Sequence, residues 1–278
     1  SLRIEDLTPG WLQSYQEYLL KQSLLWNTIS TYMRMLRAVY NRAVDMGLAP
    51  YIPRQFKNVF TGRYANHQRA LKKEEIKRVL LEDVVEEEDN LASESELAVS
   101  HTLRNLGWAR ACLELMLRFH GIPFIDLANL RKIDLRNGYL TIRRHKTGIP
   151  LSIAIDEVAM KLLRRYADND PSSPYLLNIL NSSLSGKEAY KDYQQALRIL
   201  NLQLYRLSQI CRLGKRLSSY TARHTWASIA KSCGISVAVI SEALGHVSIS
   251  TTESYLKQFD NDEIEKANKV IINYIFKK

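Results

Sequence analysis

The chain has 278 residues, and its 39 Lys and Arg exceed its 29 Asp and Glu to give a formal net charge of +10. Its apolar content of 46% excludes an intrinsically disordered chain, and its length fits two domains of ordinary size. No run of apolar residues approaches 18 and no signal-peptide pattern occurs, so we expect neither a membrane span nor a secretory leader. The basic excess favours a polyanionic partner, most often nucleic acid, over a merely solvated lysine-rich surface.

The charge is unevenly distributed along the chain. Residues 81–97 contain eight acidic residues and no basic one, so the remainder is more strongly basic than the total suggests. Cys112, Cys211 and Cys233 lie far apart and form no CxxC pair, which argues against a disulfide framework or a zinc site. We therefore expect a reducing, cytoplasmic compartment and no metal.

The first 66 residues predict a small helical unit. Residues 8–22 form an amphipathic helix, with Thr8 as N-cap and Pro9 at the first helical position. A second amphipathic helix is expected at residues 28–46, ended by Gly47. The apolar stripe of the second helix comprises Ile29, Met33, Leu36, Tyr40 and Ala43. Residues 50–69 combine prolines, a glycine and basic residues without helical periodicity, which predicts an extended basic linker.

The rest of the chain predicts a second domain, over residues 67–278. Its helices are expected at residues 71–81, 102–119, 156–167, 187–213, 221–232, 236–244 and 262–276. Two stretches of alternating polarity, 139–144 and 149–155, are joined by a short connection containing Gly148 and predict an antiparallel β-hairpin. The predicted fold is therefore mainly α with a small antiparallel β-sheet, arranged as a helical domain (1–66) followed by an α+β domain (67–278).

The most informative region is residues 219–257. Arg223 opens a helix, His246 follows 23 residues later in a Leu-Gly-His turn, and Tyr255 lies nine residues beyond His246. In residue type, order and spacing, these elements resemble the motif of the tyrosine recombinase (phage integrase) family. The stretches Tyr-x-Ala-Arg-His-Thr-Trp and Gly-Ile-Pro-Phe-Ile-Asp-Leu further resemble the integrases of Bacteroidetes mobile elements.

The resemblance covers nearly the whole chain and implies a core-site DNA-binding domain of the SAM-like kind followed by a catalytic domain. It implies site-specific cleavage and rejoining of double-stranded DNA through a 3′-phosphotyrosine intermediate. The covalent link conserves the bond energy, so no cofactor is expected. Strand exchange joins two duplexes and needs four active tyrosines, which implies a homotetramer on DNA; we expect a monomer without DNA and a place in the bacterial cytoplasm, at the nucleoid. Two alternatives stay open: an integrase homologue that binds DNA but has lost catalysis, and a type IB topoisomerase-like enzyme.

The family's roles carry over to the matching positions. Tyr255 is the expected nucleophile, and Arg223 is expected to stabilise the phosphorane oxygens because its planar guanidinium is permanently cationic. Lys146 resembles the family's β-hairpin lysine, a general acid for the leaving 5′-oxygen. His246 either donates a hydrogen bond to a phosphate oxygen or helps Tyr255 to lose its proton.

Two positions depart from the family's pattern. Pro123 stands where the family has its first arginine, and Tyr220 stands where the family has a histidine three residues before Arg223. A proline cannot neutralise a phosphate, so either activity is lost or another cation substitutes for the arginine. Tyr220 can donate a hydrogen bond through its hydroxyl or can be a core residue.

Four arginines are candidates for the missing cation: Arg118, Arg131, Arg143 and Arg144. We favour Arg144. Residues i and i+2 of a strand share a face, so Arg144 would project together with Lys146 if the strand continues that far.

A protein that cuts duplex DNA must also grip it through phosphate contacts, which set affinity and position rather than sequence preference. The basic residues expected to do so are Arg34, Arg37, Arg54, Lys57, Arg63, Lys72, Lys73 and Arg143. The amphipathic tail at residues 262–278 is expected to pack either on a neighbouring protomer or on its own domain. A serine at position 1, together with the length, leads us to expect a fragment from which an N-terminal arm-binding domain is missing.

Overall fold

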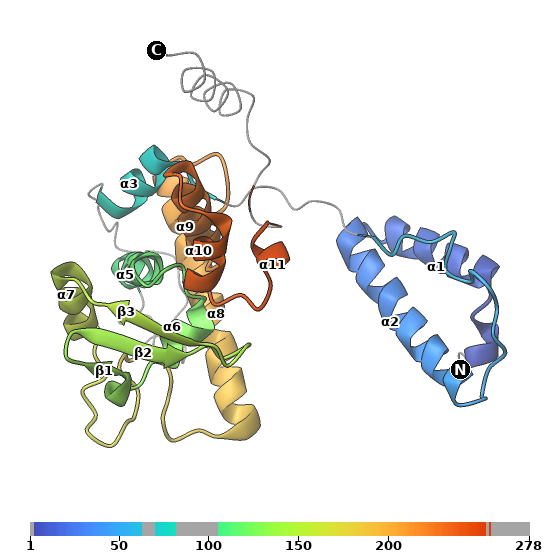
Figure 1. Cartoon of the computed structure of the whole chain (residues 1–278), viewed down its shortest axis with the longest axis horizontal. Coiled ribbons are helices and arrows are strands. Elements are labelled where there is room, and N and C mark those ends of the chain that lie inside the picture. The colour runs from blue at the N-terminus through green and yellow to red at the C-terminus, as the bar shows by residue number, and fades with distance from the viewer. Residues whose placement is uncertain (1–2, 63–69, 82–104, 254–255, 257–278) are drawn as a thin grey trace, which may run out of the picture. The chain divides into compact units, whose positions relative to one another are not determined.

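The computed structural model of the chain describes residues 3–62, 70–81, 105–253 and 256 (Figure 1). The chain divides into two compact units, Ser1–His67 and Gln68–Lys278. The predicted helix at 262–276 lies outside the described residues, as does the acidic segment from residue 82 onward.

The first unit is built on α1 (Pro9–Lys21) and α2 (Trp26–Asp45), preceded by the short 3₁₀ helix η1 (Ile4–Asp6). The predicted cap is confirmed, since Thr8 Oγ1 accepts the backbone N–H of Trp11 at 3.2 Å. Gly47 follows the end of α2 with a φ of +70°, a conformation in which glycine avoids the Cβ clash of other residues.

The prediction of an extended linker is wrong for residues 50–62. Phe56 and Val59 are buried in the core of the first unit, and Gln55 donates from Nε2 to the carbonyl of Leu7. Farther along, Ser30 Oγ donates to the carbonyl of Gly62 at 2.6 Å. Burial of two large apolar side chains outweighs the local preference of a stretch containing proline and glycine for an extended conformation. The buried apolar residues of this core are Leu7, Leu12, Leu19, Ile29, Met33, Tyr40, Phe56 and Val59.

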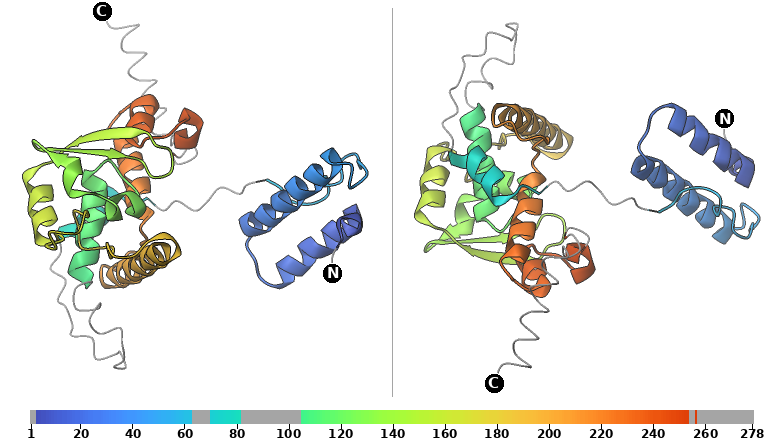
Figure 2. Two further views of the ribbon diagram at one scale, coloured as in Figure 1. Left: turned by 90° about the horizontal axis from the view of Figure 1, so that it is seen from below. Right: turned by 90° about the horizontal axis from the view of Figure 1, so that it is seen from above.

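The second unit contains eight described α-helices around a small sheet. They are α3 (Lys73–Leu81), α5 (Leu106–Arg118), α6 (Phe124–Ala128), α7 (Glu157–Arg165), α8 (Gly186–Ile210), α9 (Thr221–Ser232), α10 (Val237–Ala243) and α11 (Ile249–Glu253). Helix α5 is central, because it contacts α3, α6, α7, α8 and α9. Figure 2 shows α5 between the sheet on one side and α8 on the other.

Both ends of α5 are defined by local backbone features. Asn105 caps its start by accepting the backbone N–H of Trp108 at 3.0 Å, so the helix begins at Leu106 rather than at residue 102. After α5, His120 (φ +56°) and Gly121 (φ +67°) adopt left-handed conformations in succession. The chain thereby turns sharply toward α6, where Pro123 is the N-cap residue.

The sheet has three antiparallel strands in the order β1 (Leu135–Arg136), β2 (Tyr139–Arg143), β3 (Pro150–Ala154). The predicted hairpin is confirmed as the pair β2–β3, in which Leu140 faces Ile153 and their side chains are buried. The predicted fold class, mainly helical with a small antiparallel sheet, is therefore confirmed.

Five short elements were not predicted, because elements of two to five residues are shorter than the window in which periodicity can be seen: η1, η2 (a 3₁₀ helix, Lys132–Asp134), β1, α6 and α11. Apart from the start of α5, which lies four residues later than predicted, the predicted helices of the described residues agree with the structure to within three residues at each end. All three cysteines are free, with Cys233 exposed and the other two buried. No helix in the described ranges combines the length and the apolar character that a membrane crossing requires.

Candidate active site

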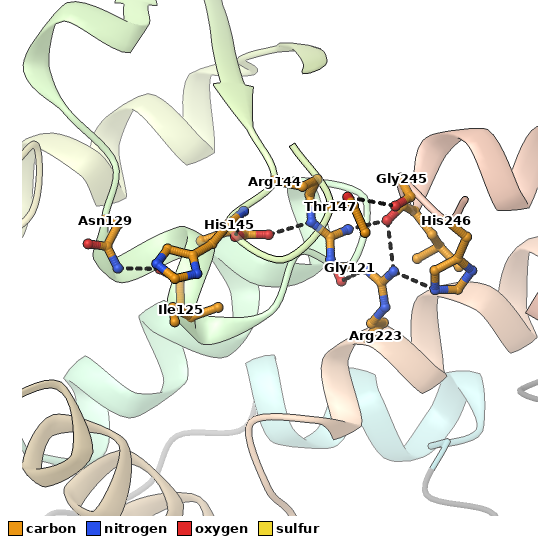
Figure 3. Close-up of polar contacts among 11 residues, drawn as sticks. Gly121, Ile125, Asn129, Arg144, His145, Thr147, Arg223, Gly245 and His246 are labelled. Atoms are coloured by element: carbon orange, nitrogen blue, oxygen red, sulfur yellow. Dashed lines mark hydrogen bonds and ion pairs between the residues drawn. The ribbon is translucent and has the colours of Figure 1, made fainter. Parts of the chain in front are cut away.

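Arg223 lies at the centre of a polar cluster in the second unit (Figure 3). Its side chain is buried on α9, and Nη1 donates to the carbonyl of Gly121 at 3.1 Å. Nη2 lies 2.7 Å from the carbonyl oxygen of Leu244 and 2.7 Å from Nε2 of His246. The arginine and histidine of the sequence motif therefore meet in space, at the end of α10.

Two glycines make room for this cluster. A Cβ at Gly121 would lie 3.1 Å from the Arg223 Cα, and a Cβ at Gly245 would lie 3.0 Å from the Cγ of Arg144. Both glycines have left-handed backbones, with φ of +67° and +62°. The turn at Gly245 follows the C-cap residue Leu244, whose carbonyl is one of the last of α10 and is left without an intrahelical donor.

Arg144, in the hairpin loop, also donates a hydrogen bond to the carbonyl of Leu244. Its Nη1 donates to the oxygen of Leu244, which thus receives donors from two guanidinium groups. On its other side, Nε of Arg144 lies 2.5 Å from Oδ2 of Asp126, as an ion pair rather than a well-directed hydrogen bond. The second oxygen of Asp126 accepts the backbone N–H of His145 at 2.9 Å. The carboxylate on α6 therefore fixes both the guanidinium of Arg144 and the backbone of the next residue in the hairpin loop, His145.

Among the contacts of the described residues, Arg144 is the one of the four candidate arginines that shares a hydrogen-bond acceptor with Arg223, the carbonyl of Leu244. Arg118 pairs instead with Glu114 and Asp156, at 2.7 and 2.5 Å. Arg131 and Arg143 are exposed. The reasoning from strand geometry is nevertheless wrong, because β2 ends at Arg143, and Arg144 is buried while Lys146 is exposed at the tip of the loop.

The cluster carries an excess of positive charge. Two buried guanidinium groups converge on one carbonyl oxygen, and the carboxylate of Asp126 pairs with the guanidinium of Arg144. Burial first, and then the positive charges of Arg223, Arg144 and Lys146, together lower the pKa of His246 to about 4. The histidine is therefore neutral at pH 7, and an anion placed between the two arginines would be strongly favoured.

The remaining predicted site residues are placed as follows. Tyr220 is 39% exposed at the start of α9, its ring 5.2 Å from that of His224, so the alternative that it is a core residue is wrong. Lys146 is exposed. Tyr255 lies outside the described residues.

The predicted DNA-binding residues are mostly exposed. Arg34 is half-buried on α2 and donates to Thr31 Oγ1 at 3.3 Å. Arg63 lies outside the described residues. The exposed members of the set are Arg37, Arg54, Lys57, Lys72, Lys73 and Arg143.

Two residues of the cluster were missed from the sequence, Asp126 and Thr252. Thr252 is fully buried on α11, and its Oγ1 lies 2.7 Å from Nδ1 of His246. Neither residue stands in a sequence pattern that indicates these contacts: Asp126 is an isolated aspartate after Pro123, and Thr252 is the second of two adjacent threonines. Within the described part of the chain, no group of three or more His, Cys, Asp or Glu side chains is arranged to hold a metal ion.

Comparison with protein families identifies the chain. Residues 86–262 match the phage integrase family, and residues 1–59 match the phage integrase SAM-like domain. The first match alone spans more than half of the chain, so the chain belongs to the phage integrase family.

Individual relatives agree with this assignment. A tyrosine recombinase of Pseudothermotoga lettingae is 25% identical over 158 residues, which are 56% of this chain and 52% of that protein. The tyrosine recombinase XerA of Pyrococcus furiosus is 28% identical over 160 residues, 55% of this chain and 53% of that protein. The matching part of the chain thus spans about half the length of these curated relatives.

A solved structure shares the fold. The lambda integrase dimer bound to a COC′ core site aligns with a TM-score of 0.62 at 14% identity, over 92% of this chain and 83% of that chain. At this level of identity the likeness concerns the fold of the protein and not the roles of individual residues.

Proposed function

We propose that this protein is a site-specific DNA recombinase that cleaves and rejoins double-stranded DNA through a 3′-phosphotyrosine intermediate. The observation that carries the proposal is the convergence of Arg223 and Arg144 on the carbonyl of Leu244, with His246 in contact with Arg223. Two buried guanidinium groups beside a neutral histidine form a site suited to a phosphodiester, whose non-bridging oxygens accept hydrogen bonds and carry the charge.

In this proposal Arg144 replaces the arginine that the family pattern has at the position of Pro123. The replacement comes from the hairpin instead of from the chain after α5, yet it reaches the same carbonyl as Arg223. Asp126 holds its guanidinium from the opposite side. Electrostatic stabilisation of a pentavalent phosphorane needs charge at a fixed position, not charge at a particular place in the sequence.

The proposed reaction is a transesterification in which a general base takes the proton of the Tyr255 hydroxyl and a general acid protonates the leaving oxygen. The hydroxyl oxygen of Tyr255 attacks the phosphorus, the bond from phosphorus to the 5′-oxygen breaks, and the 3′-phosphate becomes linked to the tyrosine. Lys146, exposed at the tip of the hairpin, supplies the proton to the leaving 5′-oxygen. A 5′-hydroxyl of the partner strand then reverses the sequence, so that no external energy source enters.

The mode of DNA binding belongs to the same proposal. Residues 1–66 act as the core-site DNA-binding domain and residues 67–278 as the catalytic domain. The eight basic residues named above as DNA-binding contact the phosphates of the duplex. The active assembly is a homotetramer on two duplexes, because each of the four strands exchanged needs its own tyrosine. The motifs around Pro123 and Arg223 further support an integrase of the type found in Bacteroidetes mobile elements.

The test is a covalent trap. A cognate duplex carrying a nick next to the cleavage position loses a short fragment after attack, and the protein then stays linked to the DNA. We expect the wild-type protein to form an adduct that is resistant to denaturation, and the Tyr255→Phe variant to form none, although it binds the same duplex.

Two other outcomes correspond to the alternative functions. Binding to the cognate duplex without any adduct would refute the enzymatic proposal and leave a DNA-binding homologue, the possibility that Pro123 and Tyr220 raise. Relaxation of an unrelated supercoiled plasmid, independent of a cognate sequence, would instead favour a type IB topoisomerase activity.

A further inference from the structure

The contacts of His246 determine which of its two ring nitrogens carries the proton. Nε2 lies 2.7 Å from Nη2 of Arg223, and Nδ1 lies 2.7 Å from Oγ1 of Thr252. A guanidinium can only donate hydrogen bonds, so Nε2 must accept. A neutral imidazole that accepts at Nε2 carries its proton on Nδ1, and Thr252 then accepts the Nδ1–H with its hydroxyl oxygen.

Thr252 is suited to hold the ring in this form. It is fully buried on α11, which packs against α10 and lies next along the chain after the turn that carries His246. The donor from Arg223 at Nε2 requires the proton on Nδ1, because the opposite tautomer would place two donors against each other. The Thr252 hydroxyl fixes the orientation of the ring and accepts this Nδ1–H, which would otherwise be buried without a partner at a cost of about 1–3 kcal/mol.

We propose that Thr252 is a positioning residue that holds His246 as the Nδ1–H tautomer, so that Nε2 serves as the proton acceptor for the tyrosine nucleophile rather than as a donor to a phosphate oxygen. The inference rests on the function proposed above and chooses between the two roles that the sequence leaves open for His246. It also accounts for the loss of a histidine at position 220, since Tyr220 has no imidazole to act as a base.

Binding of DNA frees Nε2 of His246 to accept a proton. Arg223 occupies the lone pair of Nε2 in the absence of DNA, and the scissile phosphate, a stronger acceptor than imidazole, takes over its Nη2 donor. Nε2 then accepts the hydroxyl proton of Tyr255 as that oxygen bonds to phosphorus, and Lys146 gives a proton to the 5′-oxygen. In the reverse step His246 returns its proton to the tyrosine oxygen.

The charges around His246 support this direction of transfer. The cationic groups that act on the ring are Arg223 from α9 and Arg144 and Lys146 from the hairpin, and together with burial they keep it unprotonated before DNA binds. The negative charge of a bound phosphate opposes these cations and raises the proton affinity of Nε2 at the point where a base is needed.

The tautomer can be measured without any catalysis. We expect ¹⁵N spectra of the histidine-labelled, DNA-free protein to show His246 with a protonated Nδ1 and an unprotonated Nε2 at pH 7, assigned by loss of the signal in His246→Gln. Thr252→Ser should keep this pattern, Thr252→Val should lose it, and Thr251→Val, a change of the same kind at the exposed neighbouring threonine, should not alter it. A protonated Nε2 in the wild type would overturn the proposal.

The role is tested with two cleavage substrates, one natural and one in which sulfur replaces the 5′-bridging oxygen. A thiolate leaves without protonation, so the sulfur substrate should restore cleavage by Lys146→Ala but not by His246→Gln or Thr252→Val. We expect a loss of about 10²–10⁴-fold for His246→Gln and about 10- to 100-fold for Thr252→Val, with near wild-type rates for Thr252→Ser.

The outcomes separate the two proposals. Equal rates for Thr252→Val and wild type on both substrates, or full rescue of His246→Gln by sulfur, would overturn the inference while leaving the recombinase function intact. Absence of any Tyr255-dependent adduct in the wild type would refute the recombinase function and with it the proton transfer.

Discussion

Replacement of Arg144 by alanine tests the central feature of the proposed active site. The side chains of Arg144 and Asp126 are 6% and 2% exposed, and their charged atoms are 2.5 Å apart. Truncation leaves the carboxylate buried with the backbone N–H of His145 but without its counter-charge. Breaking a buried ion pair in this way costs about 3–5 kcal/mol, which for a unit of this size lowers the Tm by about 6–20 °C.

The same change should also slow the chemistry, and a companion variant separates the two effects. Loss of one preorganised charged donor is expected to lower the cleavage rate by about 10²–10³-fold. In the double variant Arg144→Ala/Asp126→Asn no buried charge is left unpaired, and the new amide oxygen can still accept the N–H of His145. We therefore expect the double variant to regain part of the lost stability but none of the lost cleavage rate.

The assay is single-turnover formation of the covalent adduct on a nicked cognate duplex at saturating protein, below the Tm of every variant. Arg143→Ala is the matched control, because this neighbouring arginine is exposed and should weaken DNA binding without changing the rate at saturation. A folded double variant that cleaves as fast as the wild type would show that Arg144 is not the replacement for the missing arginine.

Three further predictions concern the glycine turn, acid stability and DNA binding. Gly245→Ala should lower the free energy of unfolding by roughly 1–2 kcal/mol through backbone strain, seen as a lower Tm, and should slow cleavage, because its φ is +62° and the new Cβ lies 3.0 Å from the Cγ of Arg144. Gly10→Ala, with open space around it, should do neither. The pKa of His246 is lowered to about 4, so between about pH 6.5 and 4 the unfolded chain binds a proton that the folded chain does not, and stability falls as the pH falls. Thermal melts of His246→Gln over this range should show a weaker dependence on pH, and an unchanged slope would contradict the burial of a neutral histidine. Arg37→Ala should reduce the dependence of log Kobs on log salt by about 0.9, measured by DNA-binding titrations, and an unchanged slope would remove this exposed residue from the phosphate contacts.

Local signals in the sequence were sufficient for most of the secondary structure. Thr8 as a cap, Gly47 as a helix end and the alternation in the β2–β3 hairpin each depend on neighbours within a few residues, and each is confirmed. The packing of residues 50–62 was not predicted, because burial of Phe56 and Val59 depends on surfaces of helices far away along the chain.

The sequence by itself determined the family and the motif of Arg223, His246 and Tyr255, because the spacing of chemically distinctive residues is preserved in the order of the chain. Only the tertiary structure decided that Arg144 reaches the same carbonyl as Arg223, and it did so for a reason different from strand alternation. The contacts that place it, with Asp126 and Leu244, join α6, the hairpin and the end of α10. Charge and hydrogen-bond geometry between segments so far apart have no counterpart in local sequence patterns, and the same holds for the contact of Thr252 with His246.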